Sequence, residues 1–198
     1  SFRHIRKYPV IMPLIWCIFL INIAAHAVQT TWSYYTMEKF SWDERMVGIS
    51  LGYIGILLAI VQAGLLRIII PKLGLAKSIL LGLLFNSIAL PLLGFATTTW
   101  MLFAISVLYV SAGIAGPALQ SLVSNLTPKN EQGQIQGGIA SIVSLTAIIG
   151  PPLMSNLFAY FTNKDAPYYF PGAPFIMGGL LAAIATAIAL KYIRGKHG

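Results

Sequence analysis

Residues 9–35 read PVIMPLIWCIFLINIAAHAVQTTWSYY and contain no lysine, arginine, aspartate or glutamate. A helix needs about 20 predominantly apolar residues to cross a bilayer, so this run is long enough to span one. Apolar runs of similar length cover residues 44–70, 75–96, 99–125, 132–161 and 172–193. We therefore predict an all-α membrane protein in which six transmembrane helices form one bundle.

The overall composition indicates the same class of protein. Hydrophobic residues make up 57% of the chain and charged residues 9%, whereas soluble domains carry about 25% charged residues. The net charge of +8 would suit a nucleic-acid-binding protein, but the basic residues lie in short breaks between apolar runs. We therefore expect a lipid bilayer around the chain and no nucleic acid as a partner. The single cysteine, Cys17, has no metal-ligand partner at a suitable spacing, so we expect no metal site and no cofactor.

The basic residues also predict an orientation. Ten of the thirteen lysines and arginines fall at the two chain ends and in the breaks after the second and fourth runs. Because cytoplasmic loops carry an excess of basic residues, this side should be cytoplasmic. An even number of crossings puts both termini there, in a multi-pass protein of the plasma membrane. The ten residues are Arg3, Arg6, Lys7, Arg67, Lys72, Lys77, Lys129, Lys191, Arg194 and Lys196.

Local signals indicate where two of the helices begin. Residues 41–44 read SWDE, a spacing that fits a capping box with Ser41 as the first residue, so we predict that the second helix begins there. Thr98 or Thr99 is placed to cap the fourth helix.

A polar stripe runs along the first helix. Asn22, His26, Gln29 and Ser33 are spaced i, i+4, i+7 and i+11, which places them on one helical face. Polar groups facing lipid would be costly, so this face should meet protein or water. It could be the wall of a cavity that binds a solute, or it could hold the bundle together through hydrogen bonds between helices.

The fourth helix carries a related stripe, in which Tyr109 and Gln120 are candidates for the same cavity. Gly113 and Pro117 lie between them and predict a bend or a close approach of another helix. The second helix contains a GxxxG pattern at Gly48 and Gly52, which predicts close helix packing. Gln62, near the other end of that helix, could reach the cavity from the cytoplasmic side.

The third and sixth helices are more uniformly apolar, as expected for helices that face lipid, and Asn86 is the polar exception in the third. The six helices thus form two triplets, each with a polar-striped, a small-residue and an apolar helix. Because three is an odd number, the second triplet enters the membrane from the opposite side. This pattern matches the inverted three-plus-three repeat within each half of a major facilitator.

Several segments resemble tetracycline-efflux-type transporters of the major facilitator superfamily. They are FSWDERMVGISL (40–51), GILLAIVQA (55–63), PKLG (71–74) followed by Lys77, GIAGPALQ (113–120), QGQIQG (132–137) and SLTAIIGP (144–151). The resemblance implies that residues 1–198 are the carboxyl-terminal half, helices seven to twelve, of a twelve-helix drug/proton antiporter. Since the chain begins with Ser1, we expect it to be a piece of a longer protein whose amino-terminal half precedes it.

The chain departs from this family at one position. Where the tetracycline exporters carry a histidine four residues before the glutamine of the eighth helix, this sequence has Leu58 before Gln62. The resemblance links that histidine to proton coupling. An imidazole titrates near neutrality, so we hypothesise that His26 takes over the role. The alternative is a neutral histidine that forms only hydrogen bonds.

Three other functions compete with efflux of amphipathic small molecules. A major facilitator that imports a charged metabolite usually needs an intramembrane arginine or lysine, and the predicted spans contain none near their centres. A membrane scaffold would use the polar stripes only to join helices. An enzyme has no support, because no His/Asp/Glu/Cys cluster and no nucleophile with a nearby base is present. The candidate solute-binding residues are Asn22, His26, Gln29, Gln62, Tyr109 and Gln120.

Overall fold

The computed structural model describes residues 11–194, which form helices and the connections between them, without a strand. The predicted all-α fold is confirmed. The predicted start of the first helix at Pro9, and the basic residues Arg3, Arg6, Lys7 and Lys196, lie outside the described residues. The elements are α2 (Met12–Phe40), α3 (Glu44–Ile60), the π-helix η1 (Val61–Leu65), α4 (Leu66–Phe95), α5 (Thr99–Ser111), the 3₁₀-helix η2 (Ala112–Ile114), α6 (Ala115–Leu126), α7 (Gln132–Thr162) and α8 (Ala173–Arg194).

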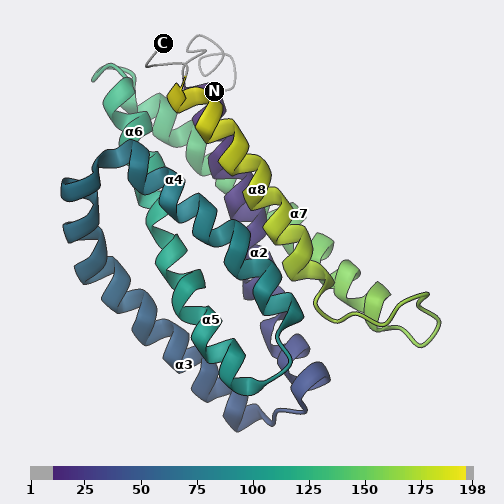
Figure 1. The fold of residues 1–198 in the computed structure, drawn as a ribbon. Coiled ribbons are helices and arrows are strands. Elements are labelled where there is room, and N and C mark those ends of the chain that lie inside the picture. Colours follow the sequence, from purple (N-terminus) through teal and green to yellow (C-terminus); the bar gives the residue numbers. More distant parts are fainter. Residues whose placement is uncertain (1–10, 195–198) are drawn as a thin grey trace.

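Five continuous helical stretches within the described residues are long and apolar enough to cross a membrane. One of them, Glu44–Phe95, has 52 residues, more than twice the length that one crossing needs. It contains Gly74 with φ 78° and ψ 163°, a backbone conformation that residues with a Cβ rarely adopt. The chain reverses direction near this point, so that α3 and α4 form a hairpin (Figure 1). The five stretches therefore supply six crossings.

The ends of α2 and α3 differ from the prediction. Helix α2 continues to Phe40, five residues past the predicted end at 35, and its last turn carries Glu38 and Lys39. Ser41 ends α2 in a left-handed conformation, φ 54°, and does not cap the next helix. The capping box was therefore wrong. Asp43 is the N-cap of α3, and its carboxylate accepts a hydrogen bond from the backbone N–H of Met46 at 2.8 Å.

The fourth predicted helix begins as expected. The Thr98 hydroxyl accepts a hydrogen bond from the backbone N–H of Met101, so Thr98 rather than Thr99 is the cap of α5. A capping oxygen satisfies one of the backbone donors that the first turn of a helix leaves unpaired.

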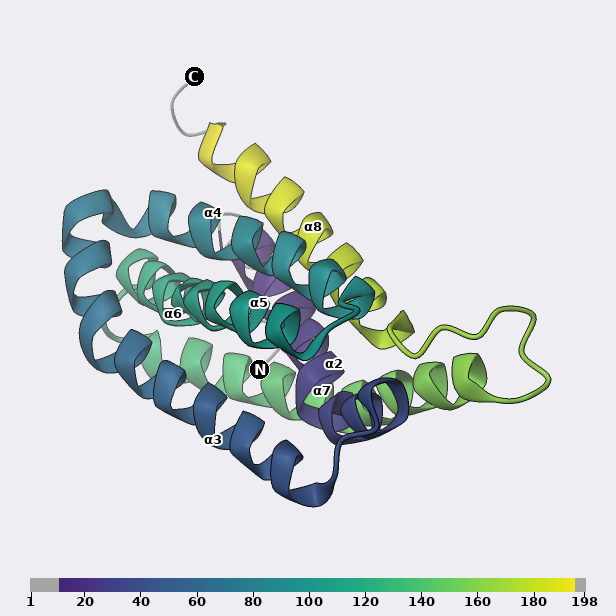
Figure 2. The same cartoon turned by 60° about the horizontal axis from the view of Figure 1, so that its bottom comes forward.

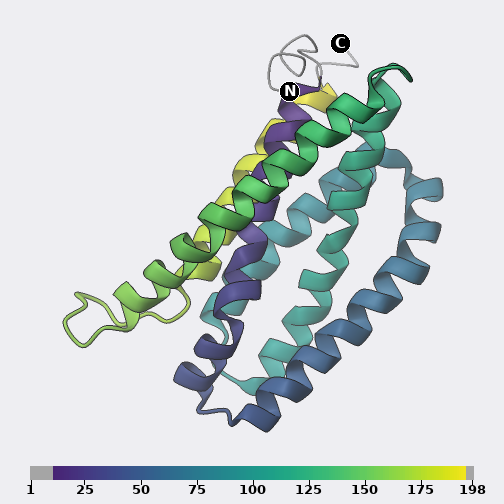
Figure 3. The same ribbon diagram turned by 180° about the vertical axis from the view of Figure 1, so that it is seen from behind.

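Helices α2, α4 and α8 form the most tightly packed part of the bundle. Helix α8 packs along both α2 and α4, and α7 crosses α2 on the other side (Figure 3). The α8 residues Phe175, Ala182 and Ala185 are fully buried. The two apolar helices that we expected to face lipid thus each bury one face in the protein. Helices α5 and α6 run between α3, α4 and α7 (Figure 2).

Helix α3 is the least buried of the crossings. It packs mainly against α5, and its glycines Gly48, Gly52 and Gly55 have no neighbouring atom within 4 Å of the position where a Cβ would lie. The close packing predicted from GxxxG is therefore absent within the described part of the chain. This glycine face is free to contact something else.

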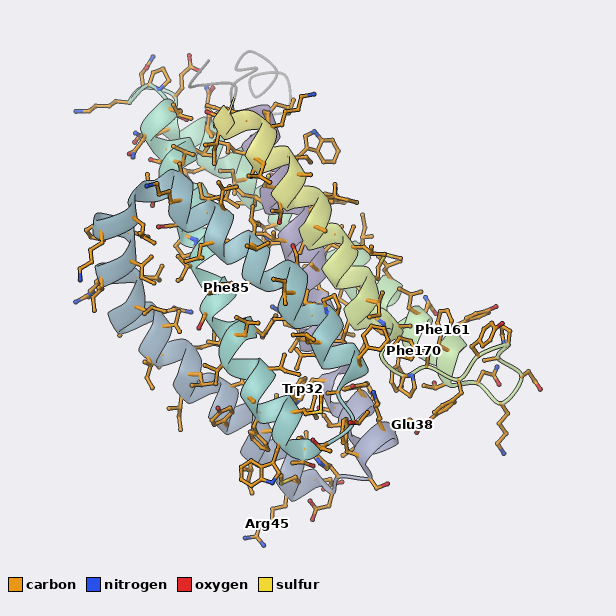
Figure 4. All side chains as sticks on the ribbon, in the orientation of Figure 1. Trp32, Glu38, Arg45, Phe85, Phe161 and Phe170 are labelled. Atoms are coloured by element: carbon orange, nitrogen blue, oxygen red, sulfur yellow. The ribbon has the colours of Figure 1, made fainter. Side chains whose placement is uncertain are left out.

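The connections between the helices lie at two ends of the bundle. Helix α2 begins and α8 ends at the same end of the bundle as the α3–α4 and α6–α7 connections (Figure 1). The opposite end holds the α2–α3, α4–α5 and α7–α8 connections, and Arg45 projects from it (Figure 4). The described basic residues of the first end are Arg67, Lys72, Lys77 and Lys129, with Lys191 in the last turns of α8.

Candidate functional site

A cavity of about 490 Å³ opens between α2, α3 and the broken helix formed by α5, η2 and α6. Its walls are mostly apolar, with amide, hydroxyl and phenol groups at separate points, and no lysine, arginine, aspartate or glutamate lines it. The lining residues are Ile21, Asn22, Ala25, Val28, Gln29, Trp32 and Ser33 of α2, Leu51, Ile54 and Leu58 of α3, Asn86 of α4, and Tyr109, Val110, Ala112, Gly113, Ala115, Gly116, Pro117 and Gln120 of the broken helix.

Helix α2 places three members of its polar stripe on the cavity wall: Asn22, Gln29 and Ser33. The Asn22 amide nitrogen donates to the Ile18 carbonyl of its own helix at 2.7 Å. This bond occupies a donor and leaves the amide oxygen of Asn22 for the cavity. The exposed Gln29 forms no side-chain hydrogen bond with any described residue. Both amides are therefore available to a solute.

The broken helix brings Tyr109 and Gln120 to the same cavity from opposite sides of η2. Proline has no backbone N–H, so Pro117 leaves the carbonyl of Gly113 without its usual helical donor. The 3₁₀ segment Ala112–Ile114 interrupts the α-helix at this place. The irregularity predicted at Gly113 is confirmed, and it exposes backbone beside the cavity. Neither the Tyr109 hydroxyl nor the Gln120 amide bonds another described residue.

Hydrogen bonds hold α3 in place at the end of the bundle where it begins. The Trp32 indole donates to the Ser50 hydroxyl at 2.9 Å and so connects α2 to α3. Tyr53 donates to the Phe103 carbonyl of α5 at 3.3 Å. Figure 4 shows Trp32 inside the bundle. Further along α3, Leu58 lines the cavity. This is the position at which the resemblance to tetracycline exporters leads us to expect a histidine.

His26 is not among the residues that line this cavity. It lies about 40° around the helix from Asn22, because four residues make slightly more than one turn. This rotation takes the imidazole to the neighbouring helix α7, where its ring atoms contact Gly150. His26 forms no side-chain hydrogen bond with a described residue. Of the predicted stripe, Asn22, Gln29 and Ser33 therefore line the cavity, whereas His26 contacts α7.

Gln62 is also separate from the cavity. It is an exposed residue of the π-helix η1. The part of α3 that lines the cavity ends at Leu58, one helical turn before Gln62. Gly55, whose face we expected Gln62 to share, does not line the cavity either. Of the six candidates, the structure brings together Asn22, Gln29, Tyr109 and Gln120.

Asn86 lines the cavity but was not among the candidates. The signal for it was present, since a lone amide in an otherwise apolar membrane helix is costly unless it has a role. The described residues contain no group of three or more His, Cys, Asp or Glu side chains that could hold a metal ion. The chemistry available in the cavity is therefore hydrogen bonding on an apolar surface.

Comparison with known proteins gives consistent matches over most of the chain. The sequence profile of the Major Facilitator Superfamily matches residues 14–197. Tetracycline resistance protein, class C, from Escherichia coli is 33% identical over 159 residues, which cover 80% of this chain and 40% of that protein. Tetracycline resistance protein, class B, also from Escherichia coli, is 32% identical over 183 residues, 92% of this chain and 44% of that protein.

A mammalian protein is also similar. Hippocampus abundant transcript 1 protein from Mus musculus is 25% identical over 211 aligned residues, which cover 96% of this chain and 43% of that protein. The chain spans less than half the length of these curated relatives. Together with the long apolar helices, the matches make this chain a multi-pass membrane protein.

Proposed function

Because the chain belongs to the Major Facilitator Superfamily, we propose that it forms the carboxyl-terminal half of a proton-coupled efflux transporter. Its substrates would be amphipathic small molecules such as tetracycline-like drugs. Its six crossings would be helices seven to twelve of twelve, and its cavity would be one wall of a site between the two halves.

The chemistry of the cavity is the observation that carries this proposal. Amide groups of Asn22, Gln29 and Gln120 and the phenol of Tyr109 are spaced over walls of leucine, isoleucine and valine. Such a surface suits a solute with apolar rings and several hydrogen-bonding groups. A strongly charged metabolite would need an opposite charge, and no lysine, arginine, aspartate or glutamate lines this wall. Efflux of amphipathic molecules is therefore favoured over import of a charged nutrient.

The exposed faces of α3 and α7 support the second part of the proposal, a partner half. Small residues let helix backbones approach closely in a membrane. On α3 these are Gly48, Gly52 and Gly55, and on α7 they include Gly133 and Gly137. At each of them, the described chain has no atom within 4 Å of the position where a Cβ would lie. A surface this accessible to another helix suits the amino-terminal half of the same transporter.

The orientation follows from the charge asymmetry between the two ends of the bundle. Basic residues of the α3–α4 and α6–α7 connections share the end at which the described chain starts and stops. We place this end, with both termini, in the cytoplasm, and the bundle in a bacterial inner membrane.

His26 is our candidate for proton coupling. Its imidazole lies between α2 and α7, one turn from Asn22, and has no hydrogen-bond partner among the described residues. A histidine that served only to join helices would be expected to bond a neighbour. An unpartnered imidazole between two helices can instead take up and release a proton, and its charge would change the packing of α2 against α7.

Transport by the full-length protein tests the proposed function. The twelve-helix transporter is reconstituted into liposomes, a pH gradient is imposed, and tetracycline uptake into the lumen is measured. We expect uptake that collapses when a protonophore removes the gradient. Absence of gradient-dependent tetracycline movement, with correctly inserted and folded protein, would refute the proposal.

A further inference from the structure

Asn86 is an unusual residue in the wall of the cavity. It lies on α4, and the oxygen of its carboxamide exposes less than 1 Å² yet accepts no hydrogen bond from the described chain. The next residue, Ser87, shows what is normal in this helix, since its hydroxyl bonds the Leu83 carbonyl at 2.8 Å and Thr186 at 3.0 Å. A buried acceptor without a partner is unfavourable, and such groups are rare in folded proteins. A partner that binds the Asn86 oxygen only part of the time would explain why the oxygen is unpaired here.

Close packing at Gly82 explains how α4 reaches a cavity formed mainly by other helices. A Cβ at Gly82 would lie 2.7 Å from the backbone nitrogen of Ala115 and 2.9 Å from the carbonyl oxygen of Ala112. The backbone of α4 therefore lies directly against the broken helix at η2. Asn86 follows Gly82 by four residues, one turn along the same face. The glycine thus places the amide beside the exposed backbone of the break.

Within the described chain, no protein group around the cavity meets the need of this amide. Asn86 forms no side-chain hydrogen bond with any described residue. One N–H of the Asn22 amide bonds Ile18, and neither its second N–H nor the Tyr109 hydroxyl or the Gln120 amide forms a hydrogen bond to Asn86. The oxygen is covered in this structure, so it meets a solute only after the amide turns about its last side-chain bond, a torsion with a broad preference.

We propose that Asn86 accepts a hydrogen bond from the transported solute and selects solutes that present an N–H or O–H group to α4. This inference rests on the proposed function and adds a residue and a chemical requirement to it. An apolar solute of the same size would leave the oxygen unpaired, so it would bind less tightly. Polar contacts to the solute then come from three crossings of this chain, because α4 adds one to those of α2 and the broken helix.

The test compares two variants of the full-length transporter with side chains of similar size, Asn86→Val and Asn86→Thr. Threonine keeps an acceptor oxygen after its proton bonds the carbonyl one turn earlier, as Ser87 does. Equilibrium binding of tetracycline, which carries several O–H and N–H donors, is measured by its fluorescence. We expect the valine variant to bind about three- to tenfold more weakly than wild type, and the threonine variant within about twofold of it. The matched control Asn125→Val, at an exposed asparagine of α6 outside the cavity, should leave binding unchanged.

A stability measurement separates solute binding from a structural role. Without tetracycline, the valine variant should unfold at the same temperature as wild type or higher, because the substitution removes an unpaired buried acceptor. A clear drop in its unfolding temperature would show that Asn86 has a partner within the transporter and would overturn the inference. Equal tetracycline binding by wild type and the valine variant would also overturn it, with the proposed function intact. Failure of the wild type itself to bind tetracycline would overturn both.

Discussion

The contact between His26 of α2 and Gly150 of α7 determines which neighbour this member of the polar stripe meets. A side chain at position 150 would collide with the imidazole, since a Cβ there would lie within van der Waals overlap of the ring. Glycine at this position is therefore what lets α7 pack over His26. The partly buried imidazole lies against α7 and does not line the cavity, which separates the proposed proton site from the proposed solute site.

The substitution His26→Gln tests this separation. Glutamine retains hydrogen-bonding groups but cannot carry a proton, so proton-driven tetracycline transport by the full-length protein should fall by roughly tenfold or more, and its dependence on pH should be lost. Tetracycline binding should remain, because His26 is outside the cavity. Transport and pH dependence equal to wild type would show that the imidazole carries no proton in the cycle.

At the scale of helices, the packing of α4 on the broken helix depends on Gly82. Alanine there would push Ala115 and Ala112 away, and the atoms in contact include backbone atoms that cannot move aside alone. We expect Gly82→Ala to destabilise the protein by about 1–3 kcal/mol. In contrast, Gly64→Ala should be neutral or stabilising by about 0.5–1 kcal/mol, because Gly64 has open space around it. Thermal unfolding in detergent measures both, and equal midpoints would contradict the packing argument.

The α7–α8 connection is held against α2 by a hydrogen bond outside the membrane spans. The Tyr169 hydroxyl donates to the Glu38 carboxylate at 2.6 Å. This bond, with smaller contributions from desolvation and the nearby negative charge, raises the pKa of Tyr169 to about 12. Because this pKa lies above the ordinary value of about 10, the stabilisation is complete below pH 10 and is lost as the pH rises through about 12. Phe161 and Phe170 lie together beside the same connection (Figure 4).

Removing the Tyr169 hydroxyl, which donates to Glu38, should loosen the α7–α8 connection. In Tyr169→Phe we expect faster amide hydrogen exchange over residues 163–172 at neutral pH, with little change in the helices. Tyr168→Phe is the matched control, because Tyr168 is 78% exposed and has no hydrogen bond with a described residue. Equal exchange in both variants would mean that the bond to Glu38 does not restrain the segment.

At the scale of the whole molecule, the proposed function makes the six crossings one wall of a site, and two helix faces are open in the described chain. The cavity lies between α2, α3 and the broken helix, and the glycine face of α3 has no neighbour in the described chain. Transporters of this architecture move solutes by rocking two halves about a central site. If this chain is one such half, as we propose, it has no second half to move against by itself.

We therefore predict that liposomes containing only this chain do not move tetracycline when a pH gradient is imposed. Reconstitution of the twelve-helix protein at the same density provides the positive control. Gradient-driven uptake by the chain alone would show that it forms a complete transporter by itself, for example by pairing two copies.

Much of the architecture could be predicted from the sequence because the bilayer restricts what a chain can do. A backbone in lipid must satisfy its own hydrogen bonds, so long apolar runs become helices, and the reversal at Gly74 falls between two predicted runs. The irregularity at Gly113 could also be predicted, because proline removes a donor wherever it occurs. The polar residues of α2 and of the broken helix could be identified for the same reason, since amides are costly against lipid.

Only the tertiary structure decided which neighbour each polar side chain meets. A rotation of about 40° along α2 separates His26, which contacts α7, from Asn22, which lines the cavity. On the next helix the cavity wall ends at Leu58, one turn before Gln62. Asn86 reaches the cavity because Gly82 lets two backbones touch, which no local pattern contains. Hydropathy and hydrogen bonding are properties of each segment, so the sequence determines the helices and their polar stripes. Contacts depend on small rotations and distances between segments, so they follow only from how the helices pack.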